Sequence, residues 1–248
     1  EGITIAYTKG SEVYGMVIRN FRNGRGLNCY QDTNLVIGRP GKGNAFYGNA
    51  DNMQFSRHEV TIQECVNTTI QSNIVGLTEN LTTPPGVLFD AAGIGLEGKN
   101  IRIGGNRSAN EGNRFGATFW GVNCYDGNNG FTPKSYFMYG NDFGVLDNSG
   151  LRCNTGIGVI ANIDSFLVGD GTSERRNRFY SQKIGVSVFN TVNPALSIRY
   201  NEFFCNDSIP IERLDLPAPV VSSASPLSIS GTTAAGALVE VYLSNPCN

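Results

Sequence analysis

The chain contains a single histidine, His58, which is the first side chain to examine for acid or base chemistry. It lies between Arg57 and Glu59, and histidine transfers protons readily because its pKa is close to neutral pH. An isolated histidine in a polar segment is more often a solvated side chain than a catalytic group. We therefore assign no catalytic role to His58.

Three arginines close together in the sequence, Arg175, Arg176 and Arg178, form a second candidate site. A guanidinium group pairs with a carboxylate through two parallel hydrogen bonds, so this cluster is suited to hold an anionic sugar. We name the three arginines as candidate binding residues, with a solvated turn as the alternative.

The longest insertion between the repeats described below, residues 125–137, follows the only tryptophan, Trp120. Loops on rigid scaffolds often carry recognition, and aromatic rings stack on sugars. The candidate binding residues of this region are Trp120, Tyr125, Asp126 and Tyr136. The alternative is that Trp120 belongs to the core.

Six cysteines are present: Cys29, Cys65, Cys124, Cys153, Cys205 and Cys247. None forms a C-x-x-C pair, and with one histidine there is no zinc-ligand spacing. We predict no metal site built from sulfur. Disulfides and buried thiols both remain open, and we favour buried thiols for Cys29 and Cys124.

The overall composition excludes two classes of partner. With 19 basic and 21 acidic residues the net charge is −2, so no basic surface for nucleic acid is expected. No apolar run approaches the ~20 residues that cross a bilayer. The 31 glycines and the low share of charged residues, 16%, favour strands and tight turns over helices.

A degenerate repeat dominates the chain. Its first element is an apolar pair that flanks one residue and is followed by glycine, as in Ile101-Arg102-Ile103-Gly104. The glycines of the copies are Gly38, Gly76, Gly104, Gly140 and Gly169, and Leu196-Ser197-Ile198 is a last copy without glycine.

The second element reads Asn-x-Phe and follows several copies of the first, beginning at Asn44, Asn113, Asn141, Asn177 and Asn201. Because 69 residues separate the first two copies, we expect one repeat without this signature, near residues 73–83. A third element, glycine followed by alternating apolar residues, begins at Gly26, Gly93, Gly121, Gly156 and Gly185.

Short alternating strands that recur every 24 to 36 residues, with no helix between them, fit the coils of a three-faced β-helix. The predicted fold is all-β: a right-handed parallel β-helix over residues 1–215, with about seven coils. Inside such a rod we expect ladders of aliphatic residues and phenylalanine, and ladders of asparagine at the bends.

The repeats resemble those of bacterial right-handed β-helix proteins of the pectate-lyase-like superfamily, most clearly in residues 34–49, 100–115 and 164–179. The resemblance implies the fold but no single activity, because this superfamily includes lyases, hydrolases, epimerases, phage tailspikes and non-catalytic adhesins. It also leaves calcium open as a cofactor, since some of its enzymes bind calcium through carboxylates. We expect no other cofactor.

The C-terminal part changes character. Residues 216–226 are rich in proline and serine, which predicts a linker. Residues 227–248 resemble the first hairpin of immunoglobulin-like modules in large bacterial surface proteins, or form a cap on the rod. Because the sequence starts with Glu1 and not with an initiator methionine, we expect a fragment of a longer protein. We expect that protein to be secreted or on the bacterial cell surface, with flanking domains that engage a secretion or surface-attachment apparatus.

The short motifs of the hydrolase branch, such as Asn-Thr-Asp and Gly-His-Gly, are absent, and the acidic residues are scattered. We therefore predict a non-catalytic surface module that binds a polysaccharide or another cell-surface ligand. The alternative is a lyase or epimerase that acts on an acidic glycan along one face of the β-helix. Ser208, in Asp207-Ser208-Ile209, resembles an O-glycosylation acceptor of secreted bacterial proteins.

Overall fold

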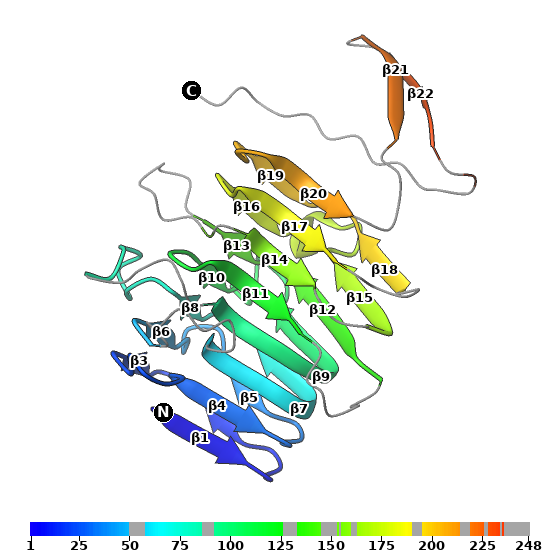
Figure 1. The fold of residues 1–248 in the computed structure, drawn as a ribbon. Coiled ribbons are helices and arrows are strands. Elements are labelled where there is room, and N and C mark those ends of the chain that lie inside the picture. The colour runs from blue at the N-terminus through cyan, green and yellow to red at the C-terminus, as the bar shows by residue number, and fades with distance from the viewer. Residues whose placement is uncertain are drawn as a thin grey trace.

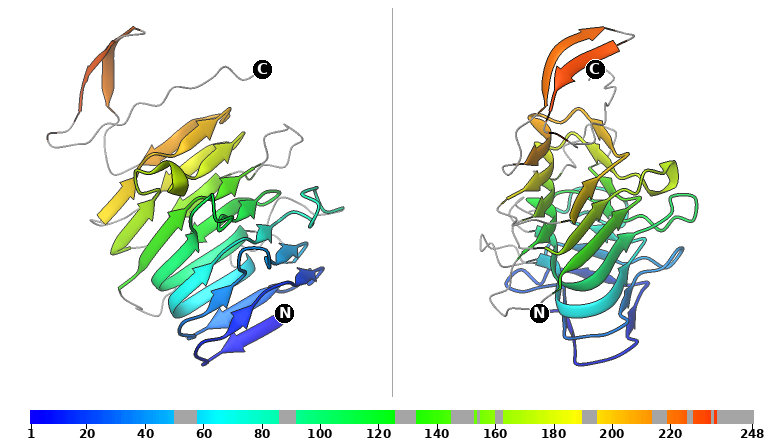
Figure 2. Two further views of the ribbon diagram at one scale, coloured as in Figure 1. Left: turned by 180° about the vertical axis from the view of Figure 1, so that it is seen from behind. Right: turned by 90° about the vertical axis from the view of Figure 1, so that its right-hand side faces the viewer.

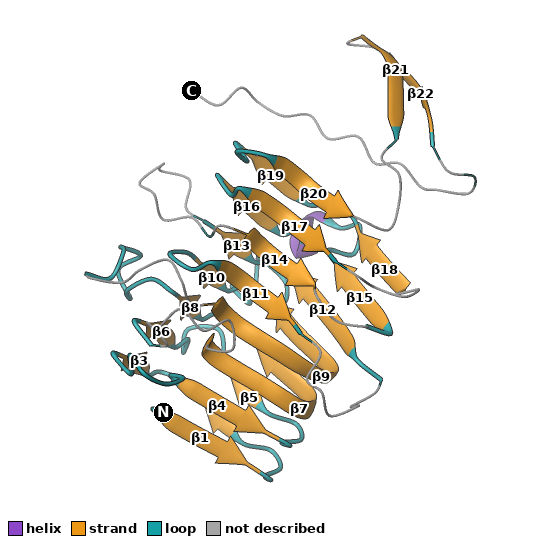
Figure 3. Cartoon of the chain, in the orientation of Figure 1, coloured by secondary structure: helices purple, strands orange, loops and turns teal. Residues whose placement is uncertain are grey.

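The computed structural model describes residues 1–49, 58–85, 92–125, 133–144, 153, 155–159, 163–189, 195–213, 219–225, 228–233 and 235. Within these residues nearly all regular structure is strand, and the one helical element is the 3₁₀ turn η1 (Ser173–Arg175) (Figure 3). The strands stack in chain order into a rod (Figure 1). The predictions of an all-β chain and of large parallel sheets are confirmed.

Three faces of parallel strands enclose the interior. The first face contains β1 (Ile3–Ala6), β4 (Leu27–Tyr30), β7 (His58–Ile70), β9 (Ala92–Gly104), β11 (Trp120–Cys124), β14 (Thr155–Val159), β17 (Ile184–Val188) and β20 (Ile209–Arg213). The second contains β2 (Glu12–Val13), β5 (Val36–Ile37), the ends of β7 and β9, β12 (Ser135–Tyr139), β15 (Ser165–Val168) and β18 (Ala195–Ile198). The third contains β3 (Val17–Arg19), β6 (Ala45–Tyr47), β8 (Ile74–Val75), β10 (Arg114–Phe115), β13 (Asp142–Phe143), β16 (Arg178–Tyr180) and β19 (Glu202–Phe204). One strand from each face makes a coil.

A buried ladder of asparagines explains the Asn-x-Phe motif. Each side-chain amide donates to Oδ1 of the next asparagine, as from Asn113 to Asn141 and from Asn141 to Asn177, both at 3.0 Å. The same amide of Asn141 also donates to the carbonyl of Ile103 at 2.9 Å. The members are Asn44, Asn73, Asn113, Asn141, Asn177 and Asn201. The ladder therefore joins neighbouring coils, and each Oδ1 also accepts the backbone N–H of the preceding asparagine, which would otherwise be buried without this acceptor.

The phenylalanines of the motif form a second ladder inside the third face. Phe143 stacks between Phe115 and Phe179, with ring centroids 4.7 and 4.8 Å apart. A Cβ on Gly121 or Gly156 would lie 2.7 Å from the ring of Phe143 or Phe179, respectively. The glycines that open the coils therefore make room for these rings.

The coil of β7 and β8 departs from the expected repeat. The sequence groups Ile74-Val75-Gly76 with the second-face copies, but β8 lies in the third face, so that assignment was wrong. The second-face strand of this coil is the end of β7. Asn73 keeps its place in the asparagine ladder. Val75 stands at the phenylalanine position of this coil, because its partners in register are Phe46 and Phe115. In the same coil Glu59 takes the position of the opening glycine, and its buried carboxylate accepts hydrogen bonds from Asn49.

A separate, exposed asparagine ladder lies at the corner between the first and second faces. Asn34, Asn67 and Asn100 have φ angles of 57°, 57° and 56°, which asparagine tolerates better than most residues. Asn100 donates to Asn67 at 2.8 Å, and Asn67 donates to Asn34 at 3.2 Å. Left-handed backbone thus accounts for the outer asparagines, and side-chain hydrogen bonding accounts for the inner ones.

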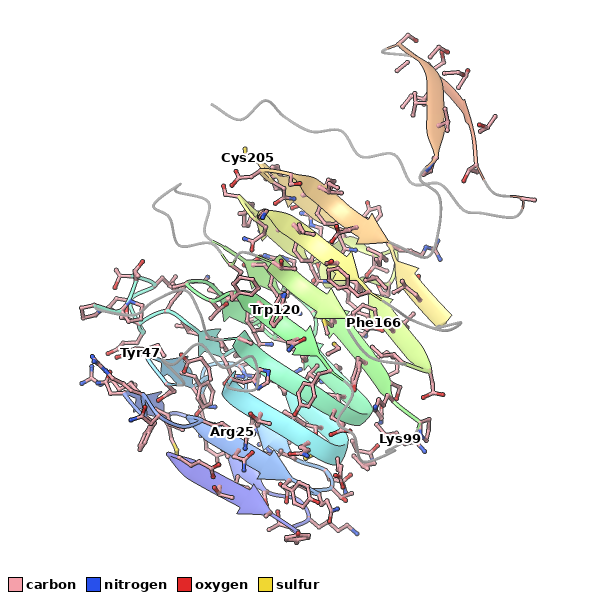
Figure 4. All side chains as sticks on the ribbon, viewed as in Figure 1. Arg25, Tyr47, Lys99, Trp120, Phe166 and Cys205 are labelled. Atoms are coloured by element: carbon pink, nitrogen blue, oxygen red, sulfur yellow. The ribbon has the colours of Figure 1, made fainter. Side chains whose placement is uncertain are left out.

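Beyond the stack, β21 (Val220–Ser225) and β22 (Ser228–Thr232) form an exposed antiparallel hairpin (Figure 2). β21 lies within the segment expected to be a linker, and residues 236–248 lie outside the described part of the chain. Cys29, Cys65, Cys124 and Cys153 are buried free thiols, which confirms the prediction for Cys29 and Cys124. Cys205, labelled in Figure 4, is disulfide-bonded.

Candidate functional site

The outer surface of the third face carries an ordered row of side chains. Side chains alternate along a strand, so the middle residue of each Asn-x-Phe motif points away from the core. The strand pairing aligns these residues from one coil to the next as Ala45, Ile74, Arg114, Asp142, Arg178 and Glu202. The row changes from apolar to charged along the rod.

An open groove of about 310 Å³ lies over the middle of this row. Much of its floor is backbone: a Cβ on Gly43 would lie 1.8 Å from the carbonyl oxygen of Ser72, and one on Gly112 would lie 2.0 Å from that of Gly140. Its side chains include Ser72, Arg107, Asn110, Arg114 and Asp142. A ligand in the groove would meet a surface of main chain with a few polar groups at its edge.

The charges of the groove favour an anion. Arg107 donates to the carboxylate of Asp142 at 2.6 Å and to the carbonyl oxygen of Gly140 at 3.1 Å, so both charges of this pair are engaged. Arg114 is exposed, and its guanidinium group has no hydrogen bond or ion pair within the described residues. Two arginines against one aspartate leave the lining with a net charge of +1.

The three arginines predicted from the sequence lie beside this groove, but acidic residues pair with them. Arg175 pairs with Asp170 at 3.2 Å and lies over the ring of Tyr139. Arg178 binds Glu202 at 2.8 Å, and Arg176 pairs with the same carboxylate. These guanidinium groups are therefore less available to a ligand than Arg114, which the sequence analysis missed.

The aromatic candidates do not join this groove. Trp120 lies on the first face (Figure 4), where its indole covers Gly158 and meets Phe119 edge to face at 4.9 Å. Tyr125 stacks on His58, with ring centroids 5.4 Å apart.

Tyr136 is fully buried in the core, where its hydroxyl oxygen accepts a hydrogen bond from the backbone of Gly98 at 3.2 Å. Its ring is enclosed by the rod and does not form part of a surface site. Asp126 lies outside the described residues, and Ser208 is exposed.

A second polar cluster, here called the first-face cluster, surrounds Gly95. The ring of His58 covers Gly95, and Thr61 and Asn123 flank that glycine in register on the neighbouring strands. Both ring nitrogens of His58, Oγ1 of Thr61 and Oδ1 of Asn123 are buried and have no hydrogen-bond partner within the described part of the chain. Burial, together with the charge of Arg25, lowers the pKa of His58 from 6.5 to about 3.

The first-face cluster also includes a buried ion pair. Nζ of Lys134 lies 3.9 Å from Oε1 of Glu97, and both side chains are buried. Among the described residues, no group of three or more histidine, cysteine, aspartate or glutamate side chains is placed to hold a metal ion. The first-face cluster is therefore a set of protein groups with acid, base and hydrogen-bonding capacity.

The fold and the groove define a β-solenoid with long parallel sheets and a cationic groove on one face. Comparison with known protein families, with curated proteins and with solved structures finds no match. No helix in the described part of the chain is long and apolar enough to cross a membrane.

Proposed function

We propose that the chain is a non-catalytic, right-handed β-helix module of about seven coils that binds an acidic glycan in the third-face groove. The observation that carries this proposal is the guanidinium group of Arg114, which no described residue pairs with, in an open, net positive groove with a floor of main chain. A carboxylate or sulfate group of the glycan would form two parallel hydrogen bonds with Arg114. The exposed amide of Asn110 would bind neighbouring hydroxyl groups.

The proposed context is a large secreted or bacterial cell-surface protein in which this rod is an adhesin-like segment. The repeats resemble the pectate-lyase-like superfamily, and residues 227–248 resemble the start of an immunoglobulin-like module or a cap. Flanking domains would connect the rod to a secretion or attachment apparatus. The exposed Ser208 is the proposed O-glycosylation acceptor.

Replacing Arg114 tests the groove. We expect Arg114→Ala to weaken binding of a polyuronate oligosaccharide about tenfold, because a bidentate, charge-assisted contact with one carboxylate is lost. Arg114→Lys keeps the charge without the planar fork and should fall between wild type and alanine. Isothermal titration calorimetry measures both affinities.

Lys99→Ala is the control for this experiment, since Lys99 is exposed on β9 and lies outside the groove (Figure 4). Its affinity should equal that of wild type. Equal losses of affinity in Arg114→Ala and Lys99→Ala would mean that binding depends only on the net charge of the protein, and would contradict a specific site in the groove.

The first-face cluster favours a second candidate function, the lyase or epimerase on an acidic glycan. His58, Tyr125 and the Glu97–Lys134 pair are of the chemical types that proton abstraction next to a uronate carboxylate uses, and because His58, Glu97 and Lys134 are buried, this function requires the first-face cluster to open to the substrate. Incubation with pectate, alginate and glycosaminoglycans tests for the lyase through the ultraviolet absorbance of unsaturated products. The binding-module proposal predicts no absorbance change, and a change abolished in His58→Ala would replace it with the lyase.

A further inference from the structure

The third-face groove continues into a second hollow, here called the apolar hollow. The volume of this hollow is about 360 Å³, compared with about 310 Å³ for the groove around Arg114. Because the two share part of their lining, they form one continuous depression on the outer surface of the third face. The shared residues are Gly41, Gly43, Ser72 and Ile74. A ligand made of linked sugars can therefore extend from one part into the other.

The side chains that line the apolar hollow from β6 and β8 are aliphatic. Ala45 and Ile74 are partners in register on these two strands, and both line the hollow. Ile74 is half-buried and packs against the small cluster of Leu77 and Ala117. Its partner in register on β10 is Arg114. Neighbouring strands lie about 4.8 Å apart, so the depression changes from apolar to cationic within one coil.

The two ionised side chains that line the apolar hollow, Lys42 and Glu79, have opposite charges, and tyrosines contact both. Nζ of Lys42 lies 5.4 Å from the centre of the ring of Tyr14. The carboxylate of Glu79 accepts a hydrogen bond from the hydroxyl group of Tyr47 at 3.0 Å. The lining of the hollow is therefore neutral, whereas the lining of the groove around Arg114 has a net charge of +1. A carboxylate of the ligand is attracted to Arg114 and not to the hollow.

The apolar hollow fits a substituent of the glycan and not its bare ring hydroxyl groups. A hydroxyl group placed on Ala45 and Ile74 would lose water without gaining a hydrogen bond from these side chains. An acetyl ester presents a methyl group, whose burial against aliphatic side chains is favourable. The ester also brings no N–H or O–H donor that needs an acceptor. Because Ile74 and Arg114 are one coil apart, the ester and the carboxylate would belong to the same sugar or to adjacent sugars.

We propose that the third-face groove selects an O-acetylated acidic glycan, with a carboxylate on Arg114 and the methyl group of an acetyl ester on Ile74 and Ala45. This inference rests on the proposed function, because it requires the glycan to bind through Arg114. It adds Ile74 as a specificity-determining residue. Both aliphatic residues lie on inner strands of the third face, since β6 pairs with β3 and β8, and β8 pairs with β6 and β10.

The test compares one polymannuronate oligosaccharide in its O-acetylated form and after removal of the esters with mild alkali. Isothermal titration calorimetry of the full chain should show about fivefold tighter binding of the acetylated form, as expected for one buried methyl group. Ile74→Thr keeps a β-branched side chain and makes this surface polar, so it should bind both forms equally. Its affinity for the de-acetylated form should equal that of wild type, which shows that the variant is folded.

Ile209→Thr is the matched control, because it makes the same substitution at an exposed position of β20 on the first face, and it should keep the fivefold preference. Arg114→Ala should weaken binding of both forms and leave their ratio unchanged. Equal wild-type affinities for the two forms would overturn the selection for acetyl esters and leave the role of Arg114 intact. A preference that persists in Ile74→Thr would overturn the contact with Ile74. Binding of neither form would contradict the proposed function itself.

Discussion

Lowering the pH from 7.5 to 5 should reduce the free energy of unfolding by about 2 kcal/mol through His58 alone. Its pKa is about 3 in the folded chain and 6.5 when solvated. Below pH 6.5 the unfolded chain therefore binds a proton on His58 that the folded chain does not bind. The free energy of unfolding is highest above pH 6.5 and falls as the pH decreases toward 3. Urea unfolding followed by circular dichroism at several pH values measures this loss.

The absence of any other histidine makes this experiment specific, because no second imidazole titrates in the same range. His58→Gln retains a polar side chain without a titratable ring and should show a nearly flat stability between pH 7.5 and 5. A wild-type profile as flat as that of the variant would mean that His58 is accessible to protons in the folded chain.

The two interior ladders could be predicted from the sequence because asparagine and phenylalanine recur at fixed positions in successive coils. The coil of Asn73 was expected from the spacing, as a repeat without the signature, but Ile74-Val75-Gly76 was assigned to the wrong face because two residues of this coil differ from the motif. Val75 replaces phenylalanine in the third face, and Glu59 replaces the opening glycine of the same coil. Both changes remove a residue type on which the repeat is recognised, so the motif disappears although the asparagine ladder continues through Asn73.

The candidate sites were predictable only in part. The alternation of side chains within Asn-x-Phe is enough to place Arg114 on the surface of the third face, and this signal was available in the sequence. The pairing of Arg178 with Glu202 depends on the register of two coils, which no local motif specifies. The first-face cluster likewise requires Thr61, Gly95 and Asn123 to align on three strands.

Asn141→Leu should lower the free energy of unfolding by about 4 kcal/mol, since each buried polar group left without a partner costs about 1–3 kcal/mol. Oδ1 of Asn141 accepts hydrogen bonds from the backbone and the side chain of Asn113, both at 3.0 Å. Its amide donates to the carbonyl oxygen of Ile103 at 2.9 Å. Leucine of similar size leaves the buried backbone N–H of Asn113 without this acceptor and removes two further hydrogen bonds, each worth about 1 kcal/mol, while the side-chain amide of Asn113 keeps its bond to the carbonyl oxygen of Ile70. Guanidinium chloride unfolding measures the loss.

The outer ladder supplies the control for Asn141. Asn67→Gly keeps the left-handed backbone and removes hydrogen bonds that are exposed to water, so it should cost less than about 1 kcal/mol. A solenoid is stabilised mainly by contacts between neighbouring coils. Amide exchange in Asn141→Leu should therefore accelerate most in β10, β13 and β16 and least in β4 and β6. Equal destabilisation by the two substitutions would mean that the buried ladder adds no more stability than the exposed one.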